Sequence, residues 1–290
     1  MYHFEKKKDV FETYVIANSV EDTYIEVIPE RGGMVANYVA QGKPVFYLDP
    51  STLVDQSKPV RGGNPILFPI CGRLVDNQYF LNGENGYSMG IHGFARDLAW
   101  TVTNVTIGDG DSASIFLELL DNENTYLQYP FRFKYTIEYR LTGTTLTVQA
   151  AIVNRGQQPM PVCAGYHPYF YIEDLNSVRM GIPSSTIHGP AKGSIAANLL
   201  FYEQDEINII YQNLQSNSFE IADSARKMNM TVHFDEIYKY LVVWSLKGKN
   251  FICVEPWMAA QNALNTLKDV VYIGPGEELS SGIRFEVNLD

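Results

Sequence analysis

The sequence predicts an all-β protein, a large antiparallel β-sandwich, from three observations. Apolar and polar residues alternate over 131–141, which is the period-two pattern of a strand with one buried face. Tyrosine and phenylalanine, which both favour strands, number 19 and 15. Turn-forming residues recur between the extended stretches, whereas convincing helical periodicity is scarce. This combination is typical of short strands joined by turns.

The individual elements follow from the same patterns. The strand over 131–141 is broken near Gly143 and resumes over 146–153, which predicts an antiparallel hairpin. Further strands are expected at 23–28, 112–120, 240–246, 250–255 and 282–289, and short helices near 194–203 and 259–268. Because there is no internal repeat and no Pro- or Ser-rich linker, residues 1–290 are expected to form a single domain.

Composition narrows the classes of partner. The net charge is −11 and the basic residues are scattered, so no nucleic-acid partner is expected, because a phosphate backbone requires a dense positive face. No apolar run approaches the ~18 residues of a membrane span, and the lysines at 6–8 precede no apolar signal segment, so we expect a cytoplasmic protein with no membrane partner. A monomer or homodimer acting on a small molecule fits this composition.

The three cysteines, Cys71, Cys163 and Cys253, are widely spaced and odd in number. They show no metal-ligand spacing, so neither a disulfide framework nor a structural metal site is expected. Free cysteines of this kind mostly behave as small buried hydrophobic residues.

Four segments combine ionisable side chains with rigid backbone signals: R-G-G-N-P-I-L-F-P-I-C-G-R (61–73), H-G-F-A-R-D-L-A-W (92–100), G-Y-H-P-Y-F (165–170) and F-I-C-V-E-P-W (251–257). His167 and Glu255 each precede a proline, which favours an extended backbone at that position. Glu255 also follows a fully apolar run, so its carboxylate must be paired, hydrogen-bonded or functional. A buried ion pair with an arginine is the alternative for Glu255, and a lone histidine is more often structural.

In their order and spacing, these segments together resemble the aldose 1-epimerases of the galactose mutarotase-like superfamily, especially the short bacterial homologues related to lactose-operon epimerase-like proteins. The resemblance covers roughly 25–287 and includes the Trp244 strand and the G-P-G-E segment at 274–277. It implies a galactose mutarotase-like supersandwich with a groove on its concave face. It also implies an isomerase that interconverts the α and β anomers of a hexose by opening and reclosing the pyranose ring.

The resemblance further implies roles for individual residues. Glu255 matches the general base of the family, His167 its general acid, and His92 the second histidine that binds and polarises the sugar. Arg73 matches the arginine that contacts sugar hydroxyls. The additional substrate-binding aspartate of the family has no assigned position here, and its candidates are Asp205 and Asp235.

The chemistry is consistent with these roles. Ring opening removes the proton of the anomeric hydroxyl and delivers a proton to the ring oxygen, so a base and an acid must flank this unit. Glu255 would then be ionised and His167 protonated when the closed sugar binds, and proximity would stabilise the two opposite charges. No metal, nucleotide or other cofactor is expected.

Arg61 and Arg96 leave the substrate open, because their segments also resemble those of hexose-6-phosphate 1-epimerases, where arginines grip the phosphate. The alternative is structural, with Arg96 as an ion-pair partner and Arg61 as a loop clamp. Among the aromatic residues, Trp257 or Phe94 is expected to reach the pocket and stack on the sugar. The strand period also places all three thiols beneath this groove.

Two other functions share the sandwich scaffold. A non-catalytic carbohydrate-binding module would need aromatic residues and hydrogen-bonding groups, but it has no need of a glutamate with two histidines. Glycoside hydrolysis would need two carboxylates flanking the scissile bond, and only Glu255 is well placed by its motif. We therefore expect an aldose 1-epimerase acting on an aldohexose, free or phosphorylated.

Overall fold

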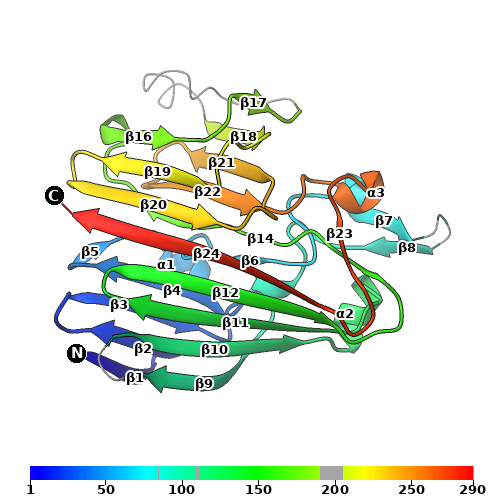
Figure 1. The fold of residues 1–290 in the computed structure, drawn as a ribbon, viewed down its shortest axis with the longest axis horizontal. Coiled ribbons are helices and arrows are strands. Elements are labelled where there is room, and N and C mark those ends of the chain that lie inside the picture. The colour runs from blue at the N-terminus through cyan, green and yellow to red at the C-terminus, as the bar shows by residue number, and fades with distance from the viewer. Residues whose placement is uncertain (82, 84, 109–110, 190–204, 290) are drawn as a thin grey trace.

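The computed structural model describes residues 1–81, 83, 85–108, 111–189 and 205–289. Within these residues the chain is built from antiparallel β-sheets with short helices between them (Figure 1). The all-β prediction is therefore confirmed. The helix expected near 194–203 lies outside the described residues, and the one expected over 259–268 is reduced to α3 (Ala263–Thr266).

The largest sheet of the described chain has eight strands and faces the viewer in Figure 1. In order across the sheet these are β16 (Val178–Gly181), β19 (Ser218–Asp223), β20 (Met228–Phe234), β24 (Glu278–Leu289), β12 (Thr145–Asn154), β11 (Phe133–Thr142), β10 (Ala113–Leu120) and β9 (Thr101–Ile107). In β11 the residues alternate between buried and more exposed, and the strand pairs with β12 in the predicted antiparallel hairpin. The period-two pattern thus identified the strand and its buried face.

Two further sheets pack against the inner face of this sheet (Figure 1). The seven-stranded sheet contains β17 (Thr186–Ile187), β18 (Glu206–Gln212), β21 (Tyr240–Leu246), β22 (Phe251–Trp257), β14 (Gly165–Tyr166) and β6 (Ile66–Leu67), with β15 (Tyr169–Tyr171) paired to β22. The five-stranded sheet contains β1 (Tyr2–Lys8), β2 (Glu12–Asn18), β3 (Thr23–Ile28), β4 (Met34–Ala40) and β5 (Lys43–Pro44). The predicted strands at 23–28 and 240–246 coincide with β3 and β21.

Smaller elements complete the described chain. Two-stranded sheets are formed by β7 (Gln78–Leu81) with β8 (Asn85–Ser88) and by β13 (Met160–Val162) with β23 (Val271–Ile273). The other helices are α1 (Pro50–Val54), α2 (Glu123–Gln128) and the 3-10 turns η1 (Val75–Asn77), η2 (Ala95–Asp97) and η3 (Leu175–Ser177). None of the helices in the described residues is long and apolar enough to cross a membrane.

The main core lies between the sheets and draws on all three of them, from Tyr2 near the start to Val287 in the last strand. Strand β22 shows how this core positions the site. Ile252 and Val254 point into the main core, whereas Cys253 and Glu255 point to the other face of the strand. Both faces are covered, so every residue of β22 is buried, which explains why the sequence there is a continuous apolar run apart from Glu255.

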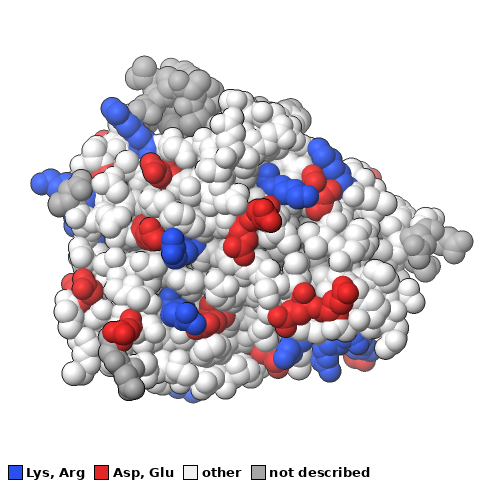
Figure 2. Space-filling view, viewed as in Figure 1, with Lys and Arg blue, Asp and Glu red and all other residues white. Residues whose placement is uncertain are grey.

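Charges on the outer face of the eight-stranded sheet are mixed. Figure 2 shows Lys and Arg side chains interspersed with Asp and Glu over this face. A phosphate backbone requires a dense positive surface, and this face does not offer one.

Candidate active site

A pocket of ≈ 420 Å³ opens on the face of the seven-stranded sheet that points away from the main core. Its size is in the range typical of small-molecule sites. The residues that line it include all three predicted catalytic residues and all three predicted arginines: His92, His167, Glu255, Arg61, Arg73 and Arg96. Segments far apart in the sequence therefore converge at one place, as predicted.

Strand periodicity explains which residues reach this pocket. Alternate residues of three adjacent strands point into it: Glu206, Asn208 and Ile210 from β18, Val242 and Trp244 from β21, and Glu255 and Trp257 from β22. The residues between them, such as Ile209 and Val243, belong to the main core. The pocket floor is thus the outer surface of a sheet whose inner surface is fixed by packing.

Glu255 lies on this floor and is only 1% exposed. Its Oε1 atom is 3.4 Å from Nε2 of His167, and its Oε2 atom accepts a hydrogen bond from Nε1 of Trp257 at 3.1 Å. Among the described residues no arginine forms an ion pair with it. The alternative of a buried Arg–Glu pair is therefore not what the structure contains.

His167 is held by its backbone and by two aromatic neighbours. Its N–H donates to the carbonyl of Pro65 at 3.0 Å, between strands β14 and β15. Its ring stacks on Tyr169 with centroids 4.7 Å apart and planes 9° apart, and meets the edge of Trp244. These contacts fix the imidazole plane so that Nε2 faces the Glu255 carboxylate.

His92 adopts a left-handed backbone conformation, with φ 66°, which is uncommon for a residue other than glycine and recurs at functional sites. Its N–H donates to the carbonyl of Gly72, and its Nδ1 accepts a hydrogen bond from the Gly72 N–H at 3.0 Å. A neutral imidazole whose Nδ1 accepts must carry its proton on Nε2. His92 therefore has one ring N–H left to donate, and its ring centroid is 5.4 Å from that of His167.

The prediction that Phe94 reaches the pocket is wrong. Gly93 forms a bridge with Phe68, and a Cβ atom at Gly93 would lie 2.2 Å from the Phe68 carbonyl oxygen, so only glycine allows this approach. The approach turns the next side chain inward, where Phe94 packs against Phe68, Tyr129 and Phe133 in the main core. Trp257, the other aromatic candidate, does line the pocket.

Arg96 lies beside the two histidines with its side chain 13% exposed. One guanidinium nitrogen donates to the carbonyl of Ile91 at 3.0 Å, and Nε is 3.7 Å from a carboxylate oxygen of Asp97. Arg96 was expected either to bind a phosphate or to act as a structural ion-pair partner. It contacts Asp97 and also lines the pocket, so the structure is compatible with each role.

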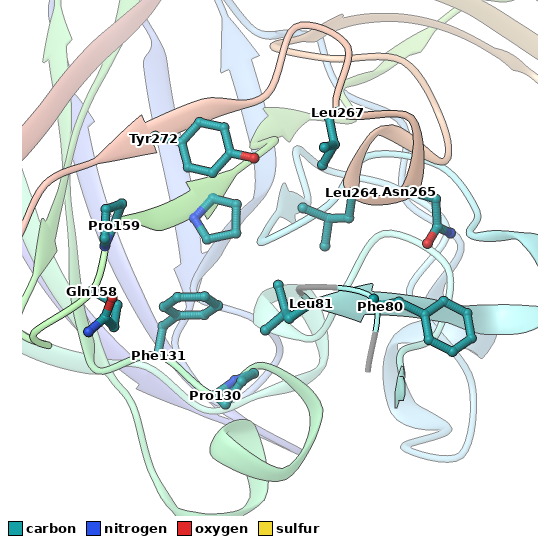
Figure 3. Close-up of a pocket in the computed structure, with 12 residues that line it drawn as sticks. Phe80, Leu81, Pro130, Phe131, Gln158, Pro159, Leu264, Asn265, Leu267 and Tyr272 are labelled. Carbon is teal, nitrogen blue, oxygen red and sulfur yellow. The ribbon is translucent and has the colours of Figure 1, made fainter. Parts of the chain in front are cut away.

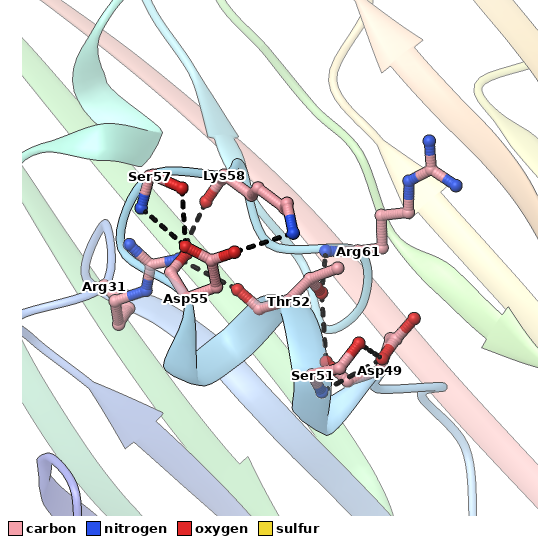
Figure 4. Close-up of polar contacts among 8 residues, drawn as sticks. All are labelled: Arg31, Asp49, Ser51, Thr52, Asp55, Ser57, Lys58 and Arg61. Atoms are coloured by element: carbon pink, nitrogen blue, oxygen red, sulfur yellow. Dashed lines mark hydrogen bonds and ion pairs between the residues drawn. The ribbon is translucent and has the colours of Figure 1, made fainter.

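Arg61 extends from a loop that a different arginine holds in place (Figure 4). The Arg31 guanidinium donates to the carbonyls of Thr52, Asp55 and Lys58, whereas Arg61 contributes only backbone bonds to this loop. Figure 4 shows the Arg61 guanidinium pointing away from the loop, and it forms no ion pair with any described residue. The loop clamp is thus Arg31, and the Arg61 side chain lines the pocket without an ion-pair partner among the described residues. Arg73 lines the same pocket as an exposed side chain.

Burial dominates the electrostatics of the three catalytic candidates. It raises the pKa of Glu255 well above its usual value, opposed by the Trp257 hydrogen bond and the Arg96 charge. Burial, followed by the Arg96 charge, lowers the pKa of His167 to about 3. The same two causes lower the pKa of His92 well below its usual value, which supports the neutral form derived from its hydrogen bonds. Burial thus opposes the ionised Glu255 and protonated His167 that are expected when a closed sugar binds.

The family is established by comparison with known proteins. The family model of aldose 1-epimerases matches residues 21–286. The chain belongs to the aldose 1-epimerase family. The resemblance inferred from the four sequence segments is therefore confirmed at the level of the family.

Relatives of this aldose 1-epimerase family member include proteins with several names. The plasmid-encoded protein LacX of Lactococcus lactis subsp. lactis is 25% identical over 242 residues, covering 72% of this chain and 78% of the relative. A protein named putative glucose-6-phosphate 1-epimerase from Cenchrus ciliaris is 24% identical over 273 residues, covering 85% of this chain and 76% of the relative. The crystal structure of the Slr1438 protein from Synechocystis sp. PCC 6803 is similar over the full length of both chains, with a TM-score of 0.91 and 32% identity. A galactose mutarotase-like protein from Clostridium acetobutylicum has the same fold, with a TM-score of 0.82 and 20% identity over 100% of this chain and 99% of that chain, so the galactose mutarotase-like fold is shown.

One acidic residue of this family member's pocket was missed by the sequence analysis. Glu206 begins β18 and accepts a hydrogen bond from Nε1 of Trp244 at 3.0 Å at the pocket wall. The two aspartates proposed for substrate binding, Asp205 and Asp235, are not among the described lining residues, and Asp235 instead accepts from the Gly282 N–H. The alternation of Glu206, Asn208 and Ile210 was the signal that could have identified this wall.

The three cysteines are all buried and free. Cys71 packs with Trp257 beneath the pocket, and Cys253 packs with Tyr169 and Phe251, so both lie where the strand period placed them. Cys163 belongs to the main core instead, so the prediction was wrong for this residue.

A second cavity, of ≈ 790 Å³, is larger than the active-site pocket but lacks its chemistry (Figure 3). Its walls include Phe131, Leu264 and Tyr272, and the described residues that line it include no His, Lys, Arg, Asp or Glu. Ring opening needs a base and an acid side by side, and Tyr272 is the only titratable side chain among the described residues that line this cavity. The smaller pocket is therefore the candidate active site.

Proposed function

We propose that this protein interconverts the α and β anomers of a hexose by acid/base opening and closing of the pyranose ring. The observation that carries the proposal is the His167–Glu255 contact, 3.4 Å between Nε2 and Oε1, at the buried floor of a pocket accessible to a small molecule. A paired acid and base in such a position is what ring opening requires. Membership of the aldose 1-epimerase family supports the same conclusion.

The proton transfers follow from the pair. Glu255 accepts the proton of the anomeric hydroxyl while His167 donates a proton to the ring oxygen, and the bond between C1 and the ring oxygen breaks to leave an open-chain aldehyde. After rotation about the C1–C2 bond, His167 takes the proton back from the hydroxyl, which attacks the aldehyde from the other face. Glu255 returns its proton to the aldehyde oxygen. His92 donates its Nε2 proton to the sugar throughout, and no step requires a cofactor.

The pair carries one proton in total before and after each step. Burial disfavours an ionised Glu255 and a protonated His167 when each is considered alone. The pair with its proton on Glu255 and the pair with its proton on His167 are, however, tautomers with the same net charge. A proton can therefore move within the pair without changing the charge of the buried site. The hydroxyl groups of a bound sugar and the nearby Arg96 stabilise the carboxylate form.

Polarimetry with freshly dissolved α-anomers tests the proposal. We expect the protein to accelerate the change in optical rotation of α-D-glucose or α-D-galactose well beyond the buffer rate. A protein that binds these sugars without accelerating mutarotation would instead be a carbohydrate-binding module, and the proposal would fail.

A 6-phosphorylated hexose is the second candidate substrate, because Arg61 reaches the pocket with its guanidinium unpaired among the described residues. Two relatives are named putative glucose-6-phosphate 1-epimerase. If Arg61 grips a phosphate, Arg61→Gln should lower kcat/KM for glucose 6-phosphate about tenfold or more and leave kcat/KM for glucose unchanged. Equal effects on both sugars would exclude this role for Arg61.

A further inference from the structure

Cys253 has no task in the proposed reaction, yet it lies beside the catalytic pair. Strand β22 places it two residues before Glu255 on the same face, where it is completely buried. One ring nitrogen of His167, the sulfur of Cys253 and one carboxylate oxygen of Glu255 all lie within 4.8 Å of one another. The segments that supply them are far apart in the sequence, so the spacing of the cysteines alone did not reveal this group.

An imidazole, a thiolate and a carboxylate are ligands of zinc-class cations. Tetrahedral Zn²⁺ with bonds of about 2.0–2.3 Å needs ligand atoms roughly 3.3–3.8 Å apart. The distance of 3.4 Å between the His167 nitrogen and the Glu255 oxygen already fits this range. The distances from the Cys253 sulfur to these two ligands are at most 4.8 Å, so they would need to shorten by about 1 Å at most. Mg²⁺ and Ca²⁺ prefer oxygen ligands, so the sulfur selects against them.

Charge and access also suit a dication. His167 and Glu255 line the pocket, so an ion can reach the group from solvent. When a dication binds, the Cys253 thiol releases its proton and the His167–Glu255 pair releases the one it shares. The resulting thiolate and carboxylate then balance the charge of the ion, so the buried complex is neutral.

We propose that His167, Cys253 and Glu255 form a binding site for a zinc-class divalent cation, which switches the active site off. The ion occupies the lone pairs through which His167 and Glu255 would move protons. Binding itself is independent of the proposed function, whereas inhibition rests on it. A histidine that binds a metal usually donates its other ring N–H to a hydrogen-bond partner, and losing that partner weakens metal binding about 10–100-fold. Nδ1 of His167 has no hydrogen-bond partner among the described residues. We therefore expect the ion to be exchangeable rather than resident.

Titration of the metal-free protein with Co²⁺ alone tests binding. We expect the near-ultraviolet band of thiolate-to-Co²⁺ charge transfer in wild type and in Cys163→Ala, a control that removes a buried cysteine of the main core. Cys253→Ala, or Cys253→Ser if the alanine variant does not fold, should lack the band. No band in wild type at millimolar Co²⁺, or an unchanged band in the Cys253 variant, would overturn the site.

Inhibition by Zn²⁺ alone tests the switch. Zn²⁺ should inhibit mutarotation by wild type and Cys163→Ala at the same concentration, with recovery on adding EDTA. Removing a residue that only hydrogen-bonds to a metal ligand lowers metal affinity about 10–100-fold. Removing the Cys253 ligand itself should therefore raise the inhibitory Zn²⁺ concentration at least about 100-fold. Equal inhibition of wild type and the Cys253 variant would overturn the switch. A cobalt band that depends on Cys253 in a protein without epimerase activity would leave the site standing and overturn the proposed function alone.

Discussion

Two histidine–glutamate pairs among the described residues have the same separation and very different surroundings. His167 and Glu255 are 3.4 Å apart with side chains 9% and 2% exposed, whereas His233 and Glu286, on the eight-stranded sheet, are 3.4 Å apart and 39% and 35% exposed. The contact is the same, but only the first pair is shielded from water and open to a pocket. Burial, rather than proximity, therefore marks the pair that can carry out chemistry.

The physical reason lies in how water treats charge. At an exposed pair, water stabilises both ionised groups and screens their attraction, so such pairs contribute about 0–1 kcal/mol to stability. In the buried pair, burial raises the pKa of Glu255 and lowers that of His167, so the two groups share one proton. This comparison can be tested by changing each pair in turn.

The largest expected effect is on turnover by the buried pair. His167→Asn and Glu255→Gln should each lower kcat about 10²–10⁴-fold, because a positioned acid or base contributes that much. The matched variants His233→Asn and Glu286→Gln should retain wild-type activity in the same polarimetric assay. Comparable losses in both sets would remove the distinction between the pairs.

A smaller effect is expected at His92, which orients the sugar through its Nε2 proton. Asparagine tolerates the left-handed backbone at this position but is too short to replace that donor. His92→Asn should therefore lower kcat/KM about 10²-fold with little change in melting temperature, as measured by polarimetry and circular dichroism. Activity near that of wild type would mean that His92 is a structural residue.

The pH profile of kcat/KM should report the buried pair, because this parameter reflects ionisations of the free enzyme. The pair holds one proton at neutral pH. Because burial lowers the pKa of His167 to about 3, a second proton binds to the pair only near that pH. Activity should hold from neutral pH down to the acid range, because the pair keeps its one shared proton there. A pair with ordinary pKa values would instead lose that proton, and with it activity, above about pH 6.5. At high pH, activity should fall as the pair loses its proton at the raised pKa of Glu255. A limb of the profile near about pH 6.5, in either direction, would contradict this account.

The smallest effect is expected from the exposed pair on stability. His233→Asn or Glu286→Gln should change the free energy of unfolding by less than about 1 kcal/mol, because solvent screens this pair. Urea denaturation at low and high salt measures this value. A loss above about 2 kcal/mol would show that exposure is a poor guide to the difference between the two pairs.

The sequence predicted seven of the described strands, β3, β10, β11, β12, β21, β22 and β24. Alternation was the main signal, because it directly records which face of a strand is buried. Glu255 stood out for a related reason, because a carboxylate at the end of a buried apolar run must be paired, hydrogen-bonded or functional. His92 and His167 could be assigned only through the family resemblance. Their convergence depends on strand pairing across the seven-stranded sheet, which no local pattern encodes.

The residues that were misjudged lie where alternation does not apply. Phe94 follows a left-handed histidine and a glycine, so strand periodicity could not tell that its side chain turns into the core. Glu206 begins a strand that the sequence analysis did not identify, and its pairing with β21 brings it to the pocket. The nearness of Cys253 to His167 likewise depends on the pairing of β15 with β22.

The central claim is that His167 and Glu255 act as one unit through a shared proton, and a double-mutant cycle tests it most directly. Mutarotation rates are measured by polarimetry for wild type, His167→Asn, Glu255→Gln and the double variant. If the pair acts as a unit, the double variant should be about as slow as either single variant, because removing one member already disables the other. If the effects of the two substitutions multiply, the residues act independently and the shared-proton account is wrong.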